Sequence, residues 1–170
     1  YGPWANNAVP LTEDAPLRPH PDLAFAVQKA EIERMVGEWA ADHADAVAAT
    51  LRPVTVVADG TSGWLAQALH AAAALPTNEE TPIQYVHVDD VAAAVVAVWA
   101  SRASGPVNVA PDGWLTPTER RALDPVPKVR LPEQVAVAVA DWRRRLRLAP
   151  TARGILAYAR HPGEVANDRL

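Results

Sequence analysis

The sequence feature that most constrains the fold is a regular alternation of short apolar segments with helical ones. Residues 83–88 (IQYVHV) and 105–110 (GPVNVA) are short, apolar and rich in β-branched side chains, as buried strands are. Between them, Asp89 is expected to cap a helix over residues 90–101. An earlier apolar segment, residues 46–60, predicts another strand that continues into a loop. This alternation predicts an α/β fold with a mainly parallel sheet.

Further helices are predicted around these strands, at about residues 22–42, 63–75, 132–148 and 151–160. Thr116, followed by Pro117 and by Glu119 three positions on, predicts a capping box that starts one more helix. The first 21 residues contain five prolines and predict an extended loop. Two apolar stripes are expected to pack inward: Phe25, Ile32, Val36 and Trp39, and, in the helix over 132–148, Val135, Val139, Trp142 and Leu146.

Composition limits the classes of protein to which the chain can belong. Its 170 residues, 49% of them hydrophobic, are enough for one compact domain with a core. The lack of cysteine excludes disulfides and thiolate chemistry and agrees with a cytoplasmic location. No apolar run reaches the roughly 18 residues of a membrane span, so no membrane partner is expected. The net charge of −4 gives no support for nucleic-acid binding.

One local cluster of positive charge leaves two interpretations open. Arg143, Arg144, Arg145 and Arg147 fall near the end of a predicted helix, where cations complement the helix dipole. The same run of arginines would also suit a docking surface for an anionic partner.

Several stretches, in this order, resemble one protein family: Tyr1-Gly2, LTEDAPLRP, FAVQKAEIE, TLRPVTVV, IQYVHVDDVAAAV and GPVNVAPDGWLT. They are similar to the C-terminal half of extended short-chain dehydrogenases/reductases, the NAD-dependent epimerase/dehydratase family. The resemblance implies the C-terminal part of a Rossmann-like, mainly parallel sheet with flanking helices and a small substrate-binding region. The family's glycine-rich phosphate-binding turn has no counterpart in the sequence. Residues 1–170 are therefore expected to be a partial single domain of a longer protein.

The resemblance places the family's Tyr-x-x-x-Lys motif on the first helix, with Lys29 at the lysine and Phe25 at the tyrosine. It implies that Lys29 binds the nicotinamide ribose. Phenylalanine exchanges no proton, so Phe25 occupies the catalytic position without being an acid or base. On the residues alone, Lys29 would be an ordinary helix lysine four residues before Glu33, and Phe25 an ordinary core contact.

The resemblance assigns three further residues, just after the strand that includes Leu51. Pro53 and Val54 are expected to flank the nicotinamide of the cofactor, and Thr55 to contact substrate. Plain packing of a strand into a loop is the alternative for all three.

Other candidate residues are weaker. Tyr85 on a strand and Tyr158 on a late helix are expected to pack in the core rather than to replace the missing acid. His87, Asp89 and Asp90 include metal-ligand side chains, but adjacent residues diverge and Asp89 is expected to cap a helix. We therefore predict no metal site.

By resemblance, the complete protein is expected to be an NAD(P)-dependent epimerase, dehydratase or reductase of the sugar-nucleotide type, atypical in its acid/base residue. NAD or NADP would be the cofactor and a small molecule, such as a nucleotide sugar, the substrate. These residues alone are expected to be inactive. The alternative is a non-catalytic sensor or scaffold that keeps the dinucleotide fold. In the family, the helix bearing the lysine often builds a dimer, so a homodimer is also expected. The sequence does not identify the substrate or distinguish NAD from NADP.

Overall fold

A computed structural model describes residues 1–64, 67–68, 81–123, 132–146, 153–158, 161 and 163–170. The elements follow one another along the chain as α1 (Ala24–Asp42), β1 (Ala49–Pro53), β2 (Thr55–Ala58), β3 (Thr61–Ser62), β4 (Tyr85–His87), α3 (Val88–Ser101), β5 (Gly105–Val109), α4 (Pro117–Leu123), α5 (Glu133–Arg145) and α6 (Arg153–Tyr158). Strand and helix alternate through the middle of the chain, as predicted.

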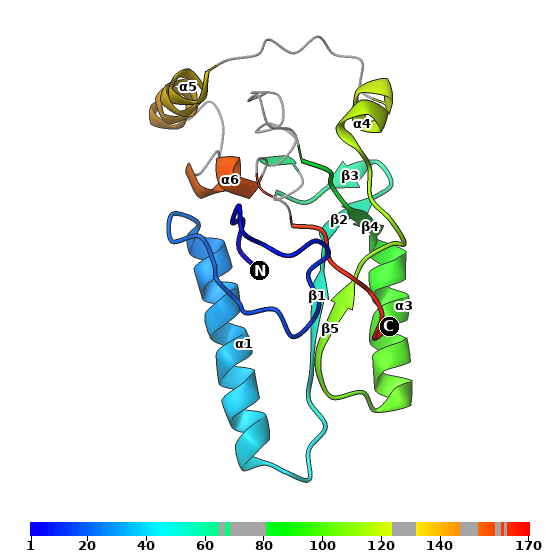
Figure 1. The fold of residues 1–170 in the computed structure, drawn as a ribbon. Helices are drawn as coiled ribbons and strands as arrows, with labels where there is room; N and C mark the ends of the chain where they lie inside the picture. The colour runs from blue at the N-terminus through cyan, green and yellow to red at the C-terminus, as the bar shows by residue number, and fades with distance from the viewer. Residues whose placement is uncertain (65–66, 69–80, 124–131, 147–152, 159–160, 162) are drawn as a thin grey trace.

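The described strands form two small sheets. β1 and β5 pair in parallel, from Ala49 opposite Gly105 to Pro53 opposite Val109. In the second sheet, β2 lies between β4, which is parallel to it, and β3, which is antiparallel. α1 and α3 stand on opposite sides of β1 and β5 (Figure 1). Helices flanking mainly parallel strands confirm the α/β prediction.

The core lies where the strands meet α3 and the two ends of the chain. Val86, Ala94 and Val109 form one buried cluster, with Leu51 and Val54 packed against it. In a second cluster, buried Leu11 and Val165 also form a parallel bridge, so the N-terminal loop and the C-terminal segment lie together. The first 21 residues form neither helix nor extended strand, which confirms the predicted loop.

The segment over residues 46–60 differs from its prediction. It forms two strands that belong to different sheets, β1 and β2, rather than one strand that continues into a loop. Val54 separates them, and its backbone N–H donates to the Val109 carbonyl oxygen over 3.1 Å. The β-branched run after Val54 then pairs with β4, from Thr55 opposite Tyr85. The chain thus passes from one sheet to the other at a single residue.

The cap of α3 was predicted at the wrong residue. His87, not Asp89, is the N-cap: it has an extended backbone, and its ring nitrogen Nδ1 accepts from the Asp89 N–H over 3.3 Å. Asp89 lies in the first turn, where its carboxylate complements the helix dipole. The capping box of α4 is confirmed. The Thr116 N–H donates to Glu119 Oε2 over 2.8 Å, and the Glu119 N–H donates to Thr116 Oγ1 over 3.3 Å.

Helix positions were predicted better than helix packing. α1 starts at Ala24, two residues later than expected, and has no buried residue; Ile32 and Trp39 of its apolar stripe are exposed. In the segment predicted as a helix over 132–148, three of the four residues expected in the core are likewise exposed: Val135, Trp142 and Leu146. An apolar stripe is buried only where another element covers it, and no described element covers these faces. Most of the helix predicted over 63–75 lies outside the described residues.

Candidate functional site

The site is positioned by the antiparallel course of α1 and β1. α1 ends at Asp42 and the chain turns back into β1 at Ala49, so the first turns of α1 lie beside the carboxyl end of β1. A side-chain contact fixes this arrangement, because Arg52 Nε donates to Glu33 Oε1 over 2.9 Å. Ligands of open α/β sheets bind at the carboxyl ends of strands. Pro53 and the N-terminal turns of α1 border such an end.

Phe25, Lys29 and Glu33 follow one another at intervals of four residues and therefore share one face of α1. Because Glu33 on this face contacts Arg52, the face is directed toward β1. Phe25 is half-buried and Lys29 is exposed. The Lys29 ammonium lies 5.5 Å from the centroid of the Phe25 ring, within the range of a cation–π contact. No ion pair joins Lys29 to another residue in the described part of the chain.

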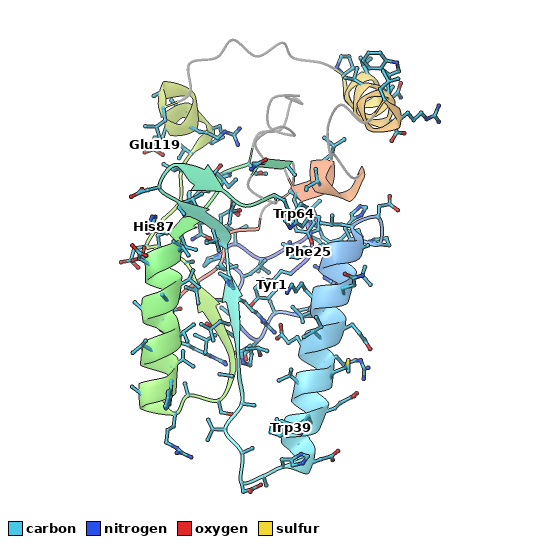
Figure 2. The ribbon with its side chains drawn as sticks, turned by 180° about the vertical axis from the view of Figure 1, so that it is seen from behind. Tyr1, Phe25, Trp39, Trp64, His87 and Glu119 are labelled. Carbon is cyan, nitrogen blue, oxygen red and sulfur yellow. The ribbon has the colours of Figure 1, made fainter. Side chains whose placement is uncertain are left out.

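Trp64 completes an aromatic pair that the sequence did not predict. Its indole meets the Phe25 ring nearly at right angles, 85° between planes and 5.0 Å between centroids, and 47% of Trp64 is exposed. Figure 2 shows the two rings together at the N-terminal end of α1. Trp64 follows β3 and is 39 positions from Phe25, so no local spacing indicates the contact.

The three residues expected near cofactor and substrate lie at the junction of the two sheets. Pro53 ends β1 and is exposed, whereas Val54 and Thr55 are half-buried. The backbone N–H of Val54 already donates to Val109, so it is not available as a donor to a ligand. The structure brings these residues to the same end of β1 as Phe25 and Lys29.

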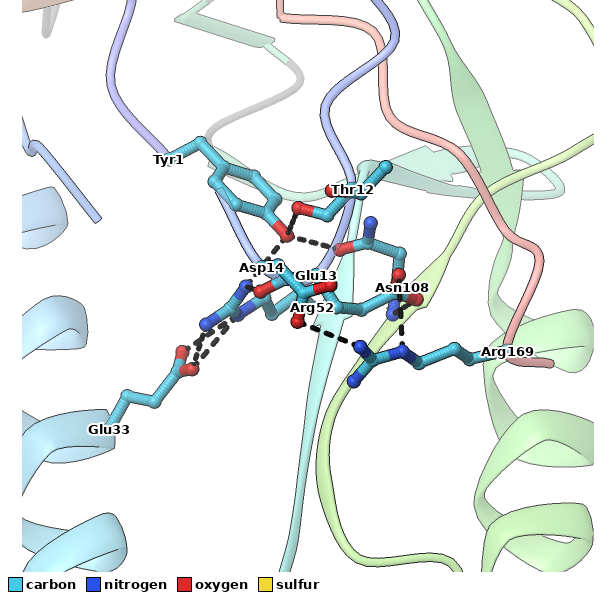
Figure 3. Close-up of polar contacts among 8 residues, drawn as sticks. All are labelled: Tyr1, Thr12, Glu13, Asp14, Glu33, Arg52, Asn108 and Arg169. Carbon is cyan, nitrogen blue, oxygen red and sulfur yellow. Dashed lines mark hydrogen bonds and ion pairs between the residues drawn. The ribbon is translucent and has the colours of Figure 1, made fainter. Parts of the chain in front are cut away.

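A polar network lies beside this end of β1 (Figure 3). Arg52 Nη1 donates to the Tyr1 hydroxyl over 2.6 Å, and that hydroxyl lies 2.8 Å from both the Thr12 carbonyl and Asn108 Oδ1. Its single proton is therefore shared between two acceptors. Burial raises the pKa of Tyr1, although the hydrogen bond from Arg52 acts in the opposite direction. Tyr1 is thus held in a neutral, fully bonded state that fits a structural role.

Asn108 is the buried centre of the same network, with 0% of its surface exposed. Its side-chain Nδ2 donates to the carbonyl oxygens of Leu11 (3.2 Å) and Ala166 (2.9 Å), and its backbone N–H donates to Glu13 Oε1 (3.0 Å). On the other side of Glu13, Arg169 Nε lies 3.8 Å from Oε2. The network ties β5 to both ends of the chain. Sequence reasoning missed it, although a polar Asn inside an apolar strand is a signal of such a role.

Of the other two tyrosines, Tyr158 contacts the N-terminal loop. The Tyr158 hydroxyl donates to the Tyr1 carbonyl over 3.0 Å, so α6 is tied to the N-terminal loop. Burial raises the pKa of both Tyr158 and Tyr85. The half-buried state of both rings fits the packing role predicted for them.

The histidine beside α3 has two acidic neighbours. His87 Nε2 lies 3.7 Å from Asp59, and Nδ1 lies 3.4 Å from the Asp89 carboxylate. Among the described residues, no group of three or more metal-ligand side chains could hold a metal ion.

The arginine run falls partly outside the described residues. Arg143, Arg144 and Arg145 end α5, whereas Arg147 is not described, so both interpretations of the run, a helix end that complements the dipole and a docking surface, stay open. Within the described part of the chain, no helix combines the length and the apolar character that crossing a membrane requires.

The model of the NAD dependent epimerase/dehydratase family matches residues 1–110. The chain belongs to this family. Because the family is NAD-dependent, membership indicates a nicotinamide dinucleotide as the cofactor. A curated relative, the 3-diazoavenalumate denitrifying reductase of a Streptomyces species, is 33% identical over 174 residues, which cover 94% of this chain and 52% of the relative.

Two solved structures share the fold. The crystal structure of gox2253 is 20% identical with a TM-score of 0.60, over 96% of this chain and 54% of that protein. The UDP-glucose 4-epimerase of Thermus thermophilus in complex with NAD is 19% identical with a TM-score of 0.50, over 89% of this chain and 48% of the epimerase. At these identities the likeness shows the Rossmann-like α/β fold alone. The chain spans about half the length of the proteins it matches.

Proposed function

We propose that this chain supplies the nicotinamide-ribose side of the active site in an NAD(P)-dependent reductase that acts on a small molecule. The observation that carries the proposal is the pair of Phe25 and Lys29, one turn apart on the face of α1 directed toward β1. A bound nicotinamide dinucleotide would supply hydride to the substrate. Lys29 would hold its ribose, and Phe25 would stand where the family has a tyrosine.

The residues present fit one end of this cofactor. An exposed ammonium at the carboxyl end of a parallel strand suits ribose hydroxyls as a hydrogen-bond donor. Pro53 and Val54 offer apolar surface at the same end, and Thr55 offers a hydroxyl toward substrate. A glycine-rich phosphate-binding turn does not occur in these 170 residues. We therefore propose that residues 1–170 form the C-terminal half of a cofactor-binding domain, and that other residues hold the pyrophosphate.

Phe25 restricts the reaction to one that needs no proton from this position. The Streptomyces relative is named for reductive loss of nitrogen from a diazo compound. Reduction of a diazonium group balances as R–N2⁺ + H⁻ → R–H + N2: a C–N bond breaks, a C–H bond forms, and no proton is consumed. An arenediazonium ion is therefore a substrate class that requires no acid at residue 25. Phe25 would contribute apolar surface and exclude water.

A second candidate function also rests on Phe25. If no reaction occurs, the chain would belong to a dinucleotide sensor or scaffold that keeps Lys29 and has lost proton transfer. A nucleotide-sugar epimerase or dehydratase is a weaker alternative, because proton transfer at a sugar hydroxyl would need a group other than Phe25.

Turnover tests these possibilities. In the full-length protein, consumption of NADH or NADPH would be measured with an arenediazonium salt and with a panel of nucleotide sugars. We expect turnover of the arenediazonium ion, a loss of about 100-fold in kcat/KM for Lys29→Ala, and little change for Phe25→Tyr. Equal turnover by Lys29→Ala would contradict the assignment of Lys29. Gain of nucleotide-sugar turnover by Phe25→Tyr would favour the sensor.

We also propose that α1 forms a homodimer interface. Val27, Ile32, Met35 and Trp39 are exposed apolar side chains on this helix. A set of exposed apolar residues on one element is typical of a protein–protein contact.

A further inference from the structure

Trp64 has the position and the exposure of a substrate-contacting side chain. It packs against Phe25, which in the proposed function stands where the family has its catalytic tyrosine. Trp64 also follows the β2–β3 hairpin, which begins directly after Pro53 and Val54. Two separate parts of the chain thus place aromatic rings at the carboxyl end of β1 (Figure 2).

The geometry of the pair leaves surface for a third ring. Two rings at 85° touch by an edge against a face, so the contact with Phe25 covers only part of the indole. Accordingly, 47% of Trp64 is exposed although Phe25 is half-buried. Flat aromatic ligands bind such surfaces by stacking, with the indole as the largest aromatic face available in a protein.

The charges nearby leave this surface open to a ligand. Glu33, the acid on the same face of α1, is bonded to Arg52, so its carboxylate is neutralised. The Lys29 ammonium lies over the ring of Phe25, its neighbour one turn back on α1. Both charged groups are therefore engaged with partners other than the exposed indole.

We propose that Trp64 and Phe25 form an aromatic wall that stacks a planar aromatic ring of the substrate. The inference rests on the proposed function, since it takes Phe25 as a border of the substrate site. It names the substrate class as an aromatic compound rather than a sugar. Trp64 would thus determine specificity, while Lys29 serves the cofactor.

Binding of a simple probe tests the wall. Cinnamate would be titrated into the full-length protein by calorimetry, with and without NAD⁺ or NADP⁺, beside cyclohexylpropanoate, which has the same charge but no aromatic ring. We expect cinnamate to bind at least about tenfold more tightly than its saturated analogue. Trp64→Ala should remove about this tenfold preference, whereas Trp64→Phe should keep most of it.

Two further variants make the outcome decisive. Trp64→Leu keeps apolar volume without an aromatic ring and should lose the preference as Trp64→Ala does, which covers the case that the alanine variant unfolds. Trp99→Ala removes an exposed tryptophan of α3 and should change nothing. Absence of cinnamate binding, or equal binding by the Trp64 variants, would overturn the wall.

Measurements on the same proteins distinguish a failure of this inference from a failure of the proposed function. Cofactor binding would be followed by the shift in melting temperature with NADH or NADPH, which Trp64→Ala should leave intact. No shift in the wild type contradicts the proposed function. A normal shift without aromatic preference contradicts the aromatic wall alone.

Discussion

At the scale of single residues, Arg52 connects more parts of the site by hydrogen bonds than Phe25 or Lys29 does. From β1 it reaches Glu33 of α1, the Tyr1 hydroxyl and the Glu13 carbonyl oxygen. The side chains of Arg52 and Glu33 are only 13% and 20% exposed. Removing one partner of a largely buried ion pair leaves the other charged group without its partner, which costs far more than the loss of a surface pair.

Replacement of Arg52 tests this role. We expect Arg52→Met to lower the free energy of unfolding by about 3 kcal/mol, measured by urea titration, because Glu33 and Tyr1 lose their common partner. Arg34→Met is the matched control: Arg34 also bridges two glutamates, Glu31 and Glu38, but on the solvent-exposed face of α1. The control should cost almost nothing. Equal losses in both variants would show that burial is not the cause.

These residues also show which contacts of the site can be predicted from the sequence and which cannot. The spacing of Phe25 and Lys29 is local, and it correctly predicted two side chains on one helix face. Trp64, Arg52 and Asn108 owe their positions to partners tens of residues away. A periodic pattern in a short stretch of sequence carries no information about contacts between distant residues. The aromatic pair and the polar network were therefore found only in the structure.

At the scale of elements, α6 meets the start of α1 so closely that only glycine fits. A Cβ on Gly154 would lie 2.8 Å from Leu23 Cβ and 2.9 Å from the Leu23 backbone nitrogen. Backbone atoms cannot move aside as a flexible side chain can. Gly37, within α1, has no atom within 4 Å of the same position.

The same substitution should therefore have opposite effects at the two glycines. Gly154→Ala is expected to lower the melting temperature, because α6 must move away from Leu23. Gly37→Ala is expected to raise the free energy of unfolding by about 0.5–1 kcal/mol, because alanine favours the helix and meets no neighbour. Thermal and urea unfolding would measure both. Stabilisation by Gly154→Ala would disprove the close approach.

The capping box of α4 adds a prediction about pH. Hydrogen bonds from the Thr116 backbone and side chain lower the pKa of Glu119. A carboxyl group with a lowered pKa stabilises the folded state above its ordinary pKa, and this contribution is lost as the pH falls through the lowered value. Nuclear magnetic resonance titration should show the Glu119 carboxyl titrating below an ordinary Glu.

Glu119→Gln provides the control, since glutamine also closes a capping box but does not titrate. The difference in stability between wild type and Glu119→Gln should shrink on acidification. A difference that is constant from neutral to acid pH would contradict the assigned cap.

The helices and strands also show where prediction from sequence patterns fails. The short apolar segment 105–110 correctly predicted β5, and the cap residue Thr116 correctly predicted α4, because both signals lie within a few positions. Burial of Ile32 and Trp142 was predicted wrongly, because an apolar stripe does not reveal what covers it. His87 displaced Asp89 as the cap of α3, because an imidazole nitrogen accepts a backbone N–H as a carboxylate does.

At the scale of the whole molecule, the exposed apolar face of α1 is the feature that needs a partner. Sedimentation should show a dimer of the full-length protein. Ile32→Asp together with Met35→Asp should yield monomers with an unchanged far-ultraviolet circular dichroism spectrum. Lysine in place of Val96, an exposed residue of α3, should leave the dimer intact. A wild-type monomer at all concentrations would contradict the proposed interface.

The role of Lys29 as a ligand of the nicotinamide dinucleotide is the assignment on which the proposed function depends most. The decisive measurement is the dissociation constant of the full-length protein for NADH and NADPH, compared between wild type and Lys29→Met, with Arg34→Met as a second cation removed from α1. We predict binding of at least one cofactor, about tenfold weaker binding for Lys29→Met, and no change for Arg34→Met. Equal binding by wild type and Lys29→Met, or no binding of either cofactor, would contradict this assignment.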